Sequence, residues 1–556
     1  MSAASALERA GGHEPARVYD AFARTAERYP EHDFLCVLPE TAERYGIAPV
    51  TISYQQALQQ VDRLQQRYRE CGVTAGQRVG LLLENRPAMF LHWFALNALD
   101  VSVVPINAEW RPAELEYLIG HAEIVLAVAP EARFEDFRQA AMAAGRALPV
   151  ATVDLDGLPA GSVRAQPPEP DAADALQREC ALLYTSGTTG KPKGCVLSND
   201  YFLTAGRWYL EIGGLCEVRA GEERLLTPLP MSHMNAMACS TLAMVLSGGC
   251  VIPVDRFHPR SWWDSVRAAR ATIIHYLGVM PAMLLGAAPS AQDRQHAVRF
   301  GFGAGVSARL HAPFEERFGF PLLEAWAMTE TGCAAAIIAN REPRKVGTAC
   351  FGRPSPQIDY RIVDESGADV EIGTHGELLV RVHGPLPAKG FFTAYLKDPE
   401  ATTAAWDGGW FHTGDVVYAD ADGHLHFVDR RKNVIRRSGE NISAVEVEGV
   451  LLQHPAVASV GVSAVPDEVR GDEVMACVVP RGGLHQGTAA LAREIQAFCL
   501  ARLAYFKAPG YVCFCEGLPL TPTEKIQRAR LRELACNLLG SECSIDLRSH
   551  KKRPGP

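Results

Sequence analysis

Residues 184–194 combine the chemical groups that hold a phosphate. The segment reads Tyr-Thr-Ser-Gly-Thr-Thr-Gly-Lys-Pro-Lys-Gly and directly follows an apolar run at residues 181–183. Glycines let backbone N–H groups face an anion, hydroxyls add donors, and lysines add positive charge. The segment is not a P-loop, because two residues rather than four separate its first two glycines and a proline follows its first lysine. A solvated surface loop is the simpler alternative, but this density of donors after a buried strand favours phosphate binding.

Four further segments place reactive side chains beside apolar strands. In residues 326–331, Trp326 could stack on a purine and Glu330 could hold Mg²⁺ on phosphate oxygens, although a structural role would explain these residues equally well. Asp415 ends a glycine turn and could accept the two hydroxyls of a ribose. Taken alone, Lys525 reads as a solvated surface charge and His233 as a core histidine.

Together these segments resemble the adenylate-forming enzymes, a family that includes acyl-CoA synthetases, firefly-type luciferases and the adenylation domains of peptide synthetases. The loop at 184–194 is similar to the family's phosphate loop nearly residue for residue. The match extends over most of the chain, which as a whole is similar to crotonobetaine/carnitine-CoA ligases. Three departures from the family pattern stand out: Trp326-Ala327 replaces a usual Tyr-Gly, Phe302 and Gly305 replace a usual Gly and Pro, and Glu524 replaces the glycine before Lys525.

The resemblance implies a set of site residues. Catalytic roles would fall to Lys525, His233, Thr329 and Glu330, with Glu330 as the ligand of Mg²⁺ and Lys432 as the hinge between two domains. The acyl pocket would include Met234, Asn235, Met237 and Gly332, with further walls at residues 276–279 and 302–304. ATP and coenzyme A would be bound by Thr185, Ser186, Gly187, Thr188, Thr189, Gly190, Lys193, Gly303, Ala304, Gly305, Glu324, Ala325, Trp326, Ala327, Thr329, Asp415, Arg430, Arg437 and Gly439.

The reaction that the resemblance implies has two steps. A carboxylic acid attacks ATP to give acyl-AMP and pyrophosphate, and the thiol of coenzyme A then displaces AMP. Lys525 would serve the first step only, and the turn at 437–440 would line the channel for the thiol in the second. A different acceptor, as in luciferases or carrier-protein ligases, and a catalytically silent nucleotide-binding regulator remain open. The pocket residues favour a small or medium acid over a long fatty acid.

Composition limits the class of protein. The 556 residues carry a net charge of −9, which argues against a general nucleic-acid or membrane-surface binder. The 15 cysteines include no Cys-x-x-Cys pair and suit a reducing compartment. The longest run without charged residues, 225–254, is interrupted by prolines and glycines, so no membrane span is expected. We therefore expect a cytoplasmic protein, monomeric or homodimeric.

Apolar periodicity predicts an α/β fold. Helical patterns at 54–71, 87–99 and 111–121 alternate with extended ones at 78–83, 101–106 and 124–129, which indicates a layered domain with mostly parallel sheets. Residues 130–179 read as a surface connection, and short strands with glycine turns after 345 indicate a β-rich subdomain. We predict an N-terminal domain at 1–430, a small mobile α+β domain at 431–540, and a disordered tail at 541–556.

Overall fold

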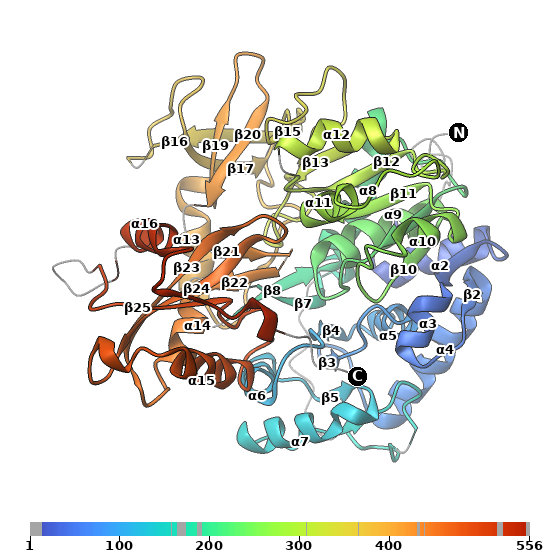
Figure 1. Ribbon diagram of the computed structural model, residues 1–556. Coiled ribbons are helices and arrows are strands. Elements are labelled where there is room, and N and C mark those ends of the chain that lie inside the picture. Colours follow the sequence, from blue (N-terminus) through green and yellow to red (C-terminus); the bar gives the residue numbers. More distant parts are fainter. Residues whose placement is uncertain are drawn as a thin grey trace.

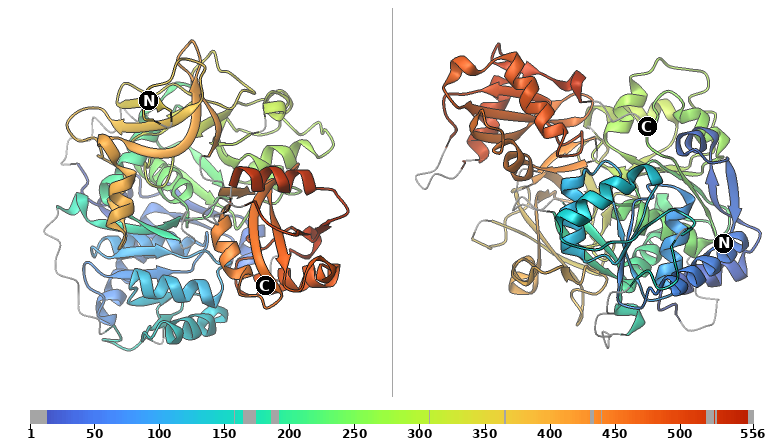
Figure 2. Two further views of the ribbon diagram at one scale, coloured as in Figure 1. Left: turned by 90° about the vertical axis from the view of Figure 1, so that its left-hand side faces the viewer. Right: turned by 90° about the horizontal axis from the view of Figure 1, so that it is seen from below.

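The structure is a computed structural model. It describes residues 14–551 except 157, 164–173, 186–191, 307, 365, 431–433, 439, 520–525 and 527. Figures 1 and 2 show two large sheets with flanking helices, a smaller sheet beside them, and a separate C-terminal body coloured orange to red. The predicted class, a layered α/β domain with a β-rich subdomain and a C-terminal α+β domain, is confirmed.

The first large sheet has the strand order β18-β8-β7-β4-β3-β5-β6. Strands β3 to β7 are mutually parallel, and β8 and β18 extend the sheet antiparallel. The strands are β3 (Arg78–Leu81), β4 (Ser102–Pro105), β5 (Leu126–Val128), β6 (Val150–Ala151), β7 (Glu179–Thr185), β8 (Lys193–Ser198) and β18 (Ala394–Tyr395).

The second large sheet has the order β14-β13-β12-β11-β9-β10-β1-β2. All its pairs are parallel except the two outermost ones. The strands are β1 (Asp33–Val37), β2 (Val50–Ser53), β9 (Arg224–Thr227), β10 (Cys250–Pro253), β11 (Ile273–Leu277), β12 (Phe300–Ala304), β13 (Leu322–Trp326) and β14 (Ile337–Ile338).

Helices connect and cover these sheets (Figure 1). They are α2 (Val18–Arg28), α3 (Pro39–Tyr45), α4 (Tyr54–Cys71), α5 (Pro87–Asn97), α6 (Pro112–Ala122), α7 (Phe134–Ala143), α8 (Asn199–Glu211), α9 (Thr241–Ser247), α10 (Trp262–Ala268), α11 (Val279–Leu285) and α12 (Ala308–Phe318). Helix α4 begins with a capping box between Ser53 and Gln56 and ends at the left-handed Gly72. Its bounds match the predicted helix. In contrast, the expected surface connection at 130–179 contains α7, whose buried Phe137 and Ala140 pack against the sheet.

The β-rich subdomain is an antiparallel sheet with the order β15-β20-β19-β17-β16. Its strands are β15 (Cys350–Gly352), β16 (Ile358–Val363), β17 (Gly376–Val382), β19 (Phe411–Ala419) and β20 (Leu425–Arg430), and α13 (Pro399–Ala405) precedes β19. Hydrophobic residues of this sheet, such as Leu378 and Val417, join the main core of the large domain.

The C-terminal body has its own hydrophobic cluster, from Ile435 to Leu547. Its sheet has the order β22-β21-β24-β25-β26, with β23 also paired to β24. The elements are β21 (Val434–Arg437), β22 (Glu440–Ser443), α14 (Ala444–Leu451), β23 (Val457–Asp467), β24 (Gly471–Pro480), α15 (Ala489–Leu500), β25 (Tyr511–Phe514), α16 (Arg528–Leu538) and β26 (Ser544–Asp546).

The expectation of a disordered tail from 541 is wrong for the residues that the structure describes. Strand β26 pairs antiparallel with β25, and Leu547 is buried in the C-terminal cluster. The Lys551 ammonium lies 2.5 Å from the Glu473 carboxylate, and both side chains are fully buried. Sheet pairing and this ion pair therefore order the chain up to residue 551. No helix of the described chain is long and apolar enough to cross a bilayer.

Candidate active site

A cavity of about 450 Å³ lies at the carboxyl ends of the parallel strands. Its walls come from the segments that follow β3, β4, β9, β10, β11, β12 and β13, and from Thr185 at the end of β7. In open parallel sheets this edge is where ligands bind, because the loops after successive strands converge there. The C-terminal body closes the cavity with five residues: Arg437, Ser438, Glu440, Tyr505 and Phe506.

The two ends of the predicted phosphate loop lie in β7 and β8. Thr185 lines the cavity and pairs across the hairpin with Lys193. The Lys193 ammonium lies 3.6 Å from the Asp398 carboxylate and 4.6 Å from the centre of the Tyr395 ring. Ser186, Gly187, Thr188, Thr189 and Gly190, between these two strands, lie outside the described residues.

The glycine turn after β12 is built by close packing. Gly303 and Ala304 line the cavity, and a Cβ atom on Gly303 would lie 2.2 Å from the Tyr276 carbonyl oxygen. Gly305 has a φ of +80°, which suits glycine. The Glu324 carboxylate accepts hydrogen bonds from the Gly305 and Val306 N–H groups, at 2.9 and 3.1 Å, and from the Tyr276 hydroxyl. Glu324 thus holds the shape of the turn from behind.

Trp326 and Asp415 form a buried pair. The Trp326 indole N–H donates to the Asp415 carboxylate at 2.8 Å, and Asp415 is 1% exposed. Asp415 lies directly opposite Arg430 in the β19–β20 ladder, so the strands place both predicted ribose ligands at one position. The flanking Ala325 and Ala327 line the cavity.

Thr329 and Glu330 follow β13 and line the cavity. The Tyr395 hydroxyl donates to one oxygen of the buried Glu330 carboxylate at 2.8 Å, which fixes its orientation. Mg²⁺ is bound in phosphate sites by one or two carboxylates together with substrate oxygens. One oriented carboxylate at the cavity wall fits that requirement.

Part of the predicted acyl wall lines the cavity. His233, Met234 and Asn235 line the cavity, as do Tyr276, Leu277 and Phe302. His233 Nε2 lies 3.7 Å from the Glu440 carboxylate of the C-terminal body. Asn235 begins the π-helix η4 (Asn235–Ser240), and its side-chain oxygen lies 2.7 Å from His275 Nδ1.

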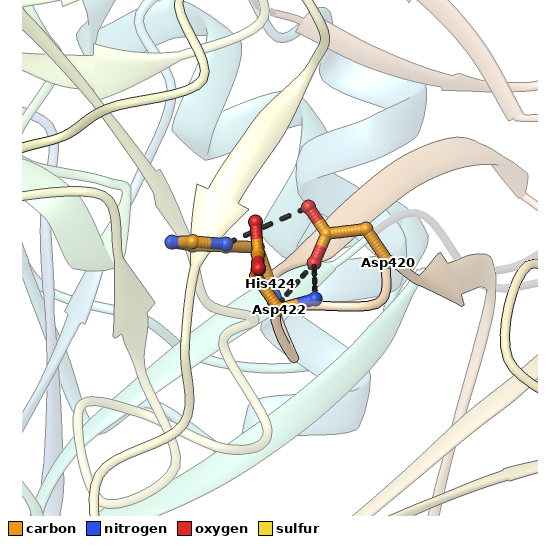
Figure 3. Close-up of side chains that lie close together, drawn as sticks. All are labelled: Asp420, Asp422 and His424. Carbon is orange, nitrogen blue, oxygen red and sulfur yellow. Dashed lines mark hydrogen bonds and ion pairs between the residues drawn. The ribbon is translucent and has the colours of Figure 1, made fainter.

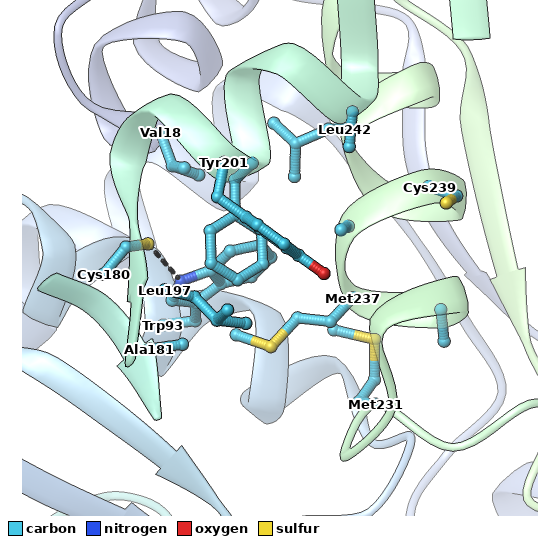
Figure 4. Close-up of a cluster of buried hydrophobic side chains, with 14 of the residues drawn as sticks. Val18, Trp93, Cys180, Ala181, Leu197, Tyr201, Met231, Met237, Cys239 and Leu242 are labelled. Atoms are coloured by element: carbon cyan, nitrogen blue, oxygen red, sulfur yellow. Dashed lines mark hydrogen bonds between the residues drawn. The ribbon is translucent and has the colours of Figure 1, made fainter. Parts of the chain in front are cut away.

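Two predicted pocket residues lie elsewhere. Met237 points from η4 into the main hydrophobic core, where it is fully buried near Tyr201 and Met231 (Figure 4). Gly332 has a φ of +53°, and a Cβ atom there would lie 2.5 Å from the Tyr201 ring. This close approach explains why residue 332 is a glycine.

Arg437 is buried beneath the turn that faces the cavity. Its guanidinium donates to Glu473 at 2.7 Å, and Lys551 bonds the other oxygen of the same carboxylate. Burial and the nearby Arg437 lower the pKa of Lys551 to about 7. The position of Ser438 and Glu440 is therefore set by buried charges. Gly439, Lys432 and Lys525 lie outside the described residues, and of Arg430 only the backbone is described.

Several cavity residues were not predicted from the sequence. Trp208 on α8, Cys239 on η4, and Tyr505 and Phe506 before β25 line the cavity. Trp208 lies in a helix with aromatic residues on several sides, so its sequence pattern indicates only burial. Tyr505 and Phe506 follow α15, in a stretch where no sequence pattern marks a site.

A second polar cluster lies in the hairpin between β19 and β20. Asp420, Asp422 and His424 are close enough to share a cation (Figure 3). However, the Asp420 carboxylate accepts the N–H groups of Asp422 and His424, and Lys345 pairs with Asp422 at 2.7 Å. These hydrogen bonds and the ion pair with Lys345 explain the cluster as a structural turn without a bound cation.

Comparisons with known proteins agree with this arrangement. The model of the AMP-binding enzyme family matches residues 22–392, and that of the AMP-binding enzyme C-terminal domain matches residues 446–525. A crotonobetaine/carnitine–CoA ligase of Escherichia coli O45:K1 (strain S88 / ExPEC) is 30% identical over 493 residues, which cover 86% of this chain and 93% of that protein.

Solved structures share the fold. A double mutant of o-succinylbenzoate CoA synthetase from Bacillus subtilis superposes with a TM-score of 0.77 at 24% identity, over 92% of this chain and 98% of the other. A malonyl-CoA ligase bound to methylmalonyl-CoA and AMP superposes with a TM-score of 0.71 at 25% identity, over 88% of this chain and 97% of the other. The chain therefore belongs to the AMP-binding enzymes, the adenylate-forming family that its motifs resemble.

Proposed function

We propose that this chain is an ATP-dependent acyl-CoA synthetase. It joins a small-molecule carboxylic acid to AMP with release of pyrophosphate, and then transfers the acyl group to the thiol of coenzyme A. One observation carries the proposal: a single cavity joins the end of the phosphate loop, the Thr329–Glu330 segment and the turn of the C-terminal body at Ser438 and Glu440. The similarity to a crotonobetaine/carnitine–CoA ligase supports coenzyme A as the acceptor.

In the first step, charge must be stabilised on the phosphates while the acid attacks. Mg²⁺, held by Glu330, would supply positive charge to the phosphate oxygens. The Trp326–Asp415 pair would hold the ribose, since a carboxylate accepts vicinal hydroxyls. Lys525 would reach the acid and the α-phosphate, and a preorganised charge of this kind is worth roughly 10²–10³ in rate.

In the second step, the thiol must reach the acyl carbon. The turn at 437–440 already faces the acyl wall, with Glu440 beside His233. We therefore propose that this arrangement of the C-terminal body serves thiol transfer, and that the body rotates about Lys432 to bring in Lys525 for adenylation. The polar His233 and Asn235 on an otherwise apolar wall suit a small or medium acid with a polar group. The division of the chain near residue 430, a cytoplasmic location and a monomeric or homodimeric state are part of the same proposal.

The test measures both products. ATP, Mg²⁺ and coenzyme A are incubated with acetate-sized, branched, carnitine-like, benzoate-type and C12 acids, and pyrophosphate and acyl-CoA are quantified. We expect acid-dependent pyrophosphate release with formation of the matching thioester. Pyrophosphate without thioester would indicate another acceptor, as in luciferases or carrier-protein ligases. No release with any acid would favour a silent nucleotide-binding regulator, and a clear preference for C12 would contradict the pocket argument.

Lys525→Ala separates the two steps. The variant should form acyl-AMP roughly 10²–10³ times more slowly. It should still convert synthetic acyl-AMP and coenzyme A to acyl-CoA at the rate of the unchanged protein. Undiminished formation of acyl-AMP would contradict the assignment of Lys525.

A further inference from the structure

Two thiols face each other in the wall of the cavity. Cys239 Sγ and Cys333 Sγ lie 3.2 Å apart, and both side chains line the cavity although each is at most 2% exposed. The structure describes all 15 cysteines, and all are free thiols. Neither thiol has a part in the two steps proposed above. Two thiols at this distance are candidates for a disulfide bond.

The two thiols come from parts of the site that serve different substrates. Cys239 lies in the π-helix η4, which begins with Asn235 of the acyl wall. Cys333 follows the segment of Thr329 and Glu330, to which we assign the phosphates and Mg²⁺. Figure 4 shows Cys239 on the helical turn next to Tyr201 and Met237. A covalent link between the thiols would join the acyl wall to the nucleotide segment.

The geometry needs little change to form such a link. A disulfide has its sulfur atoms about 2.05 Å apart, so the two thiols must approach by roughly another 1.2 Å. The Cys333 side cannot move freely, because Gly332 is packed against the Tyr201 ring. The approach must therefore come mainly from the Cys239 side chain, which lies on the π-helix η4, a type of helix that is common at functional sites.

We propose that Cys239 and Cys333 are a redox modification site, at which a peroxide forms a disulfide that blocks the acyl pocket. One thiol attacks hydrogen peroxide to give a sulfenic acid and one water, and the second thiol displaces the sulfenic oxygen as a second water. The two sulfur atoms each lose one electron, and the peroxide gains two. An added dithiol reverses the reaction by thiol–disulfide exchange.

The surroundings of the two thiols determine how fast the disulfide forms and how far it slows the proposed reaction. The hydrogen bond with Cys239 and burial raise the pKa of the Cys333 thiol well above its usual value. Since the thiolate is the reactive form, the pair should react slowly with peroxide at neutral pH. A displacement of about 1 Å in a binding site can cost up to about 10²-fold in rate, so the disulfide should slow the adenylation step by roughly tenfold or more.

The chemical test does not depend on activity. The reduced protein is treated with hydrogen peroxide, its remaining thiols are alkylated, and intact mass and peptide masses are measured. We expect two fewer alkyl groups than in the untreated protein and a Cys239–Cys333 cross-linked peptide about 2 Da lighter than its two free peptides together, both reversed by dithiothreitol before alkylation. Absence of this peptide, or oxidation to sulfinic acid without it, would overturn the proposal. This outcome is independent of the proposed function.

The activity test rests on the proposed function and uses matched variants. Cys239→Ala and Cys333→Ala are each compared with their own reduced state, and Cys216→Ala, at another buried thiol away from the cavity, is the control. Peroxide should slow acid-dependent pyrophosphate release roughly tenfold in the unchanged protein and in Cys216→Ala, and much less in the other two variants. Equal inactivation of all four proteins would contradict a role for the pair. A bound acid should protect the thiols by filling the cavity.

Discussion

The Trp326 indole N–H donates a hydrogen bond to the Asp415 carboxylate, and both groups are buried. Their hydrogen bond of 2.8 Å explains why an indole replaces the family's usual tyrosine without leaving a buried donor unpaired. Because hydrogen bonds to a charged group contribute about 1.5–3 kcal/mol, this single residue should carry a measurable part of ATP binding.

Asp415→Asn tests that contribution. The amide keeps the volume and can still accept from Trp326, but it loses the charge that would hold two ribose hydroxyls. We expect the KM for ATP to rise by about ten- to a hundredfold, which corresponds to about 1.4–2.8 kcal/mol. Initial rates are measured against ATP concentration, and the melting temperature is measured in parallel to detect misfolding.

Asp422→Asn is the matched control, because Asp422 is exposed in the hairpin that joins β19 to β20. Its KM for ATP should equal that of the unchanged protein. If the two variants behaved alike, Asp415 would have no special role in ATP binding.

The residue types and their spacing indicated which segments form the site better than they indicated which contacts each residue makes. The segments around Thr185, Gly303, Thr329 and His233 converge on the cavity as the motifs predicted. The spacing could not show that Met237 faces the core, because a π-helix rotates its side chains away from α-helical positions. Nor could it show that Glu324 supports a glycine turn, because that turn is distant in sequence.

At the scale of the element, η4 is anchored by a buried histidine. His275 of β11 bonds Asn235 through Nδ1 and the Tyr209 hydroxyl through Nε2, at 2.7 and 3.0 Å. Its ring also lies 4.7 Å from that of Phe302. Burial lowers the pKa of His275 to about 3. The network that shapes the acyl wall therefore requires a neutral imidazole.

This requirement predicts a dependence of stability on pH. Between about pH 6.5 and 3, the unfolded chain binds a proton at this residue and the folded chain does not, so the free energy of unfolding should fall as the pH falls. One such group contributes at most about 1.4 kcal/mol per pH unit. His275→Gln should remove that contribution from the slope.

Tryptophan fluorescence suits the measurement, because all eight tryptophans precede residue 430 and report on the large domain alone. Urea unfolding is followed at pH 7, 6 and 5. His92, buried with its pKa lowered to about 4, adds a second contribution that His92→Gln should remove. The exposed His485 supplies the control variant His485→Gln. Equal slopes in all four proteins would contradict the argument.

Elements with strong local signals were predictable. Helix α4 has a capping box, an amphipathic pattern and a terminal glycine, and its predicted and observed bounds agree. Helix α7 was missed because its alanine-rich sequence lies among prolines and lacks a capping residue that bonds its first turn. Strand β26 has three residues, and only its pairing with β25 makes it a strand.

At the scale of the whole molecule, Lys507 ties the C-terminal body to the large domain. Its ammonium lies 2.7 Å from Glu114 of α6 and 2.9 Å from Glu446 of α14, and all three side chains are at least nine-tenths buried. Burial opposes the charge, but the two carboxylates outweigh it and hold the pKa of Lys507 above its usual value. No sequence pattern could reveal this contact, because its partners are 393 residues apart.

Rotation of the C-terminal body would break the bond to Glu114 and keep the one to Glu446. Removing one partner of a buried charge pair costs about 2–5 kcal/mol, so Glu114 should bias the molecule toward the arrangement seen here. Glu114→Gln should therefore lower the rate of acyl transfer to coenzyme A by roughly thirtyfold, for a loss of about 2 kcal/mol. The rate of acyl-AMP formation should stay unchanged or rise.

Single-turnover rates of the two steps test this, the second starting from synthetic acyl-AMP. Glutamine still accepts the Arg111 N–H at the start of α6, so the helix itself is preserved. Glu116→Gln, at an exposed position of the same helix, is the control and should change neither rate. A variant at Glu114 that slowed both steps equally would show that the contact supports folding alone. Slowing of transfer by itself would mean that one buried lysine decides how long the thiol-transfer arrangement persists.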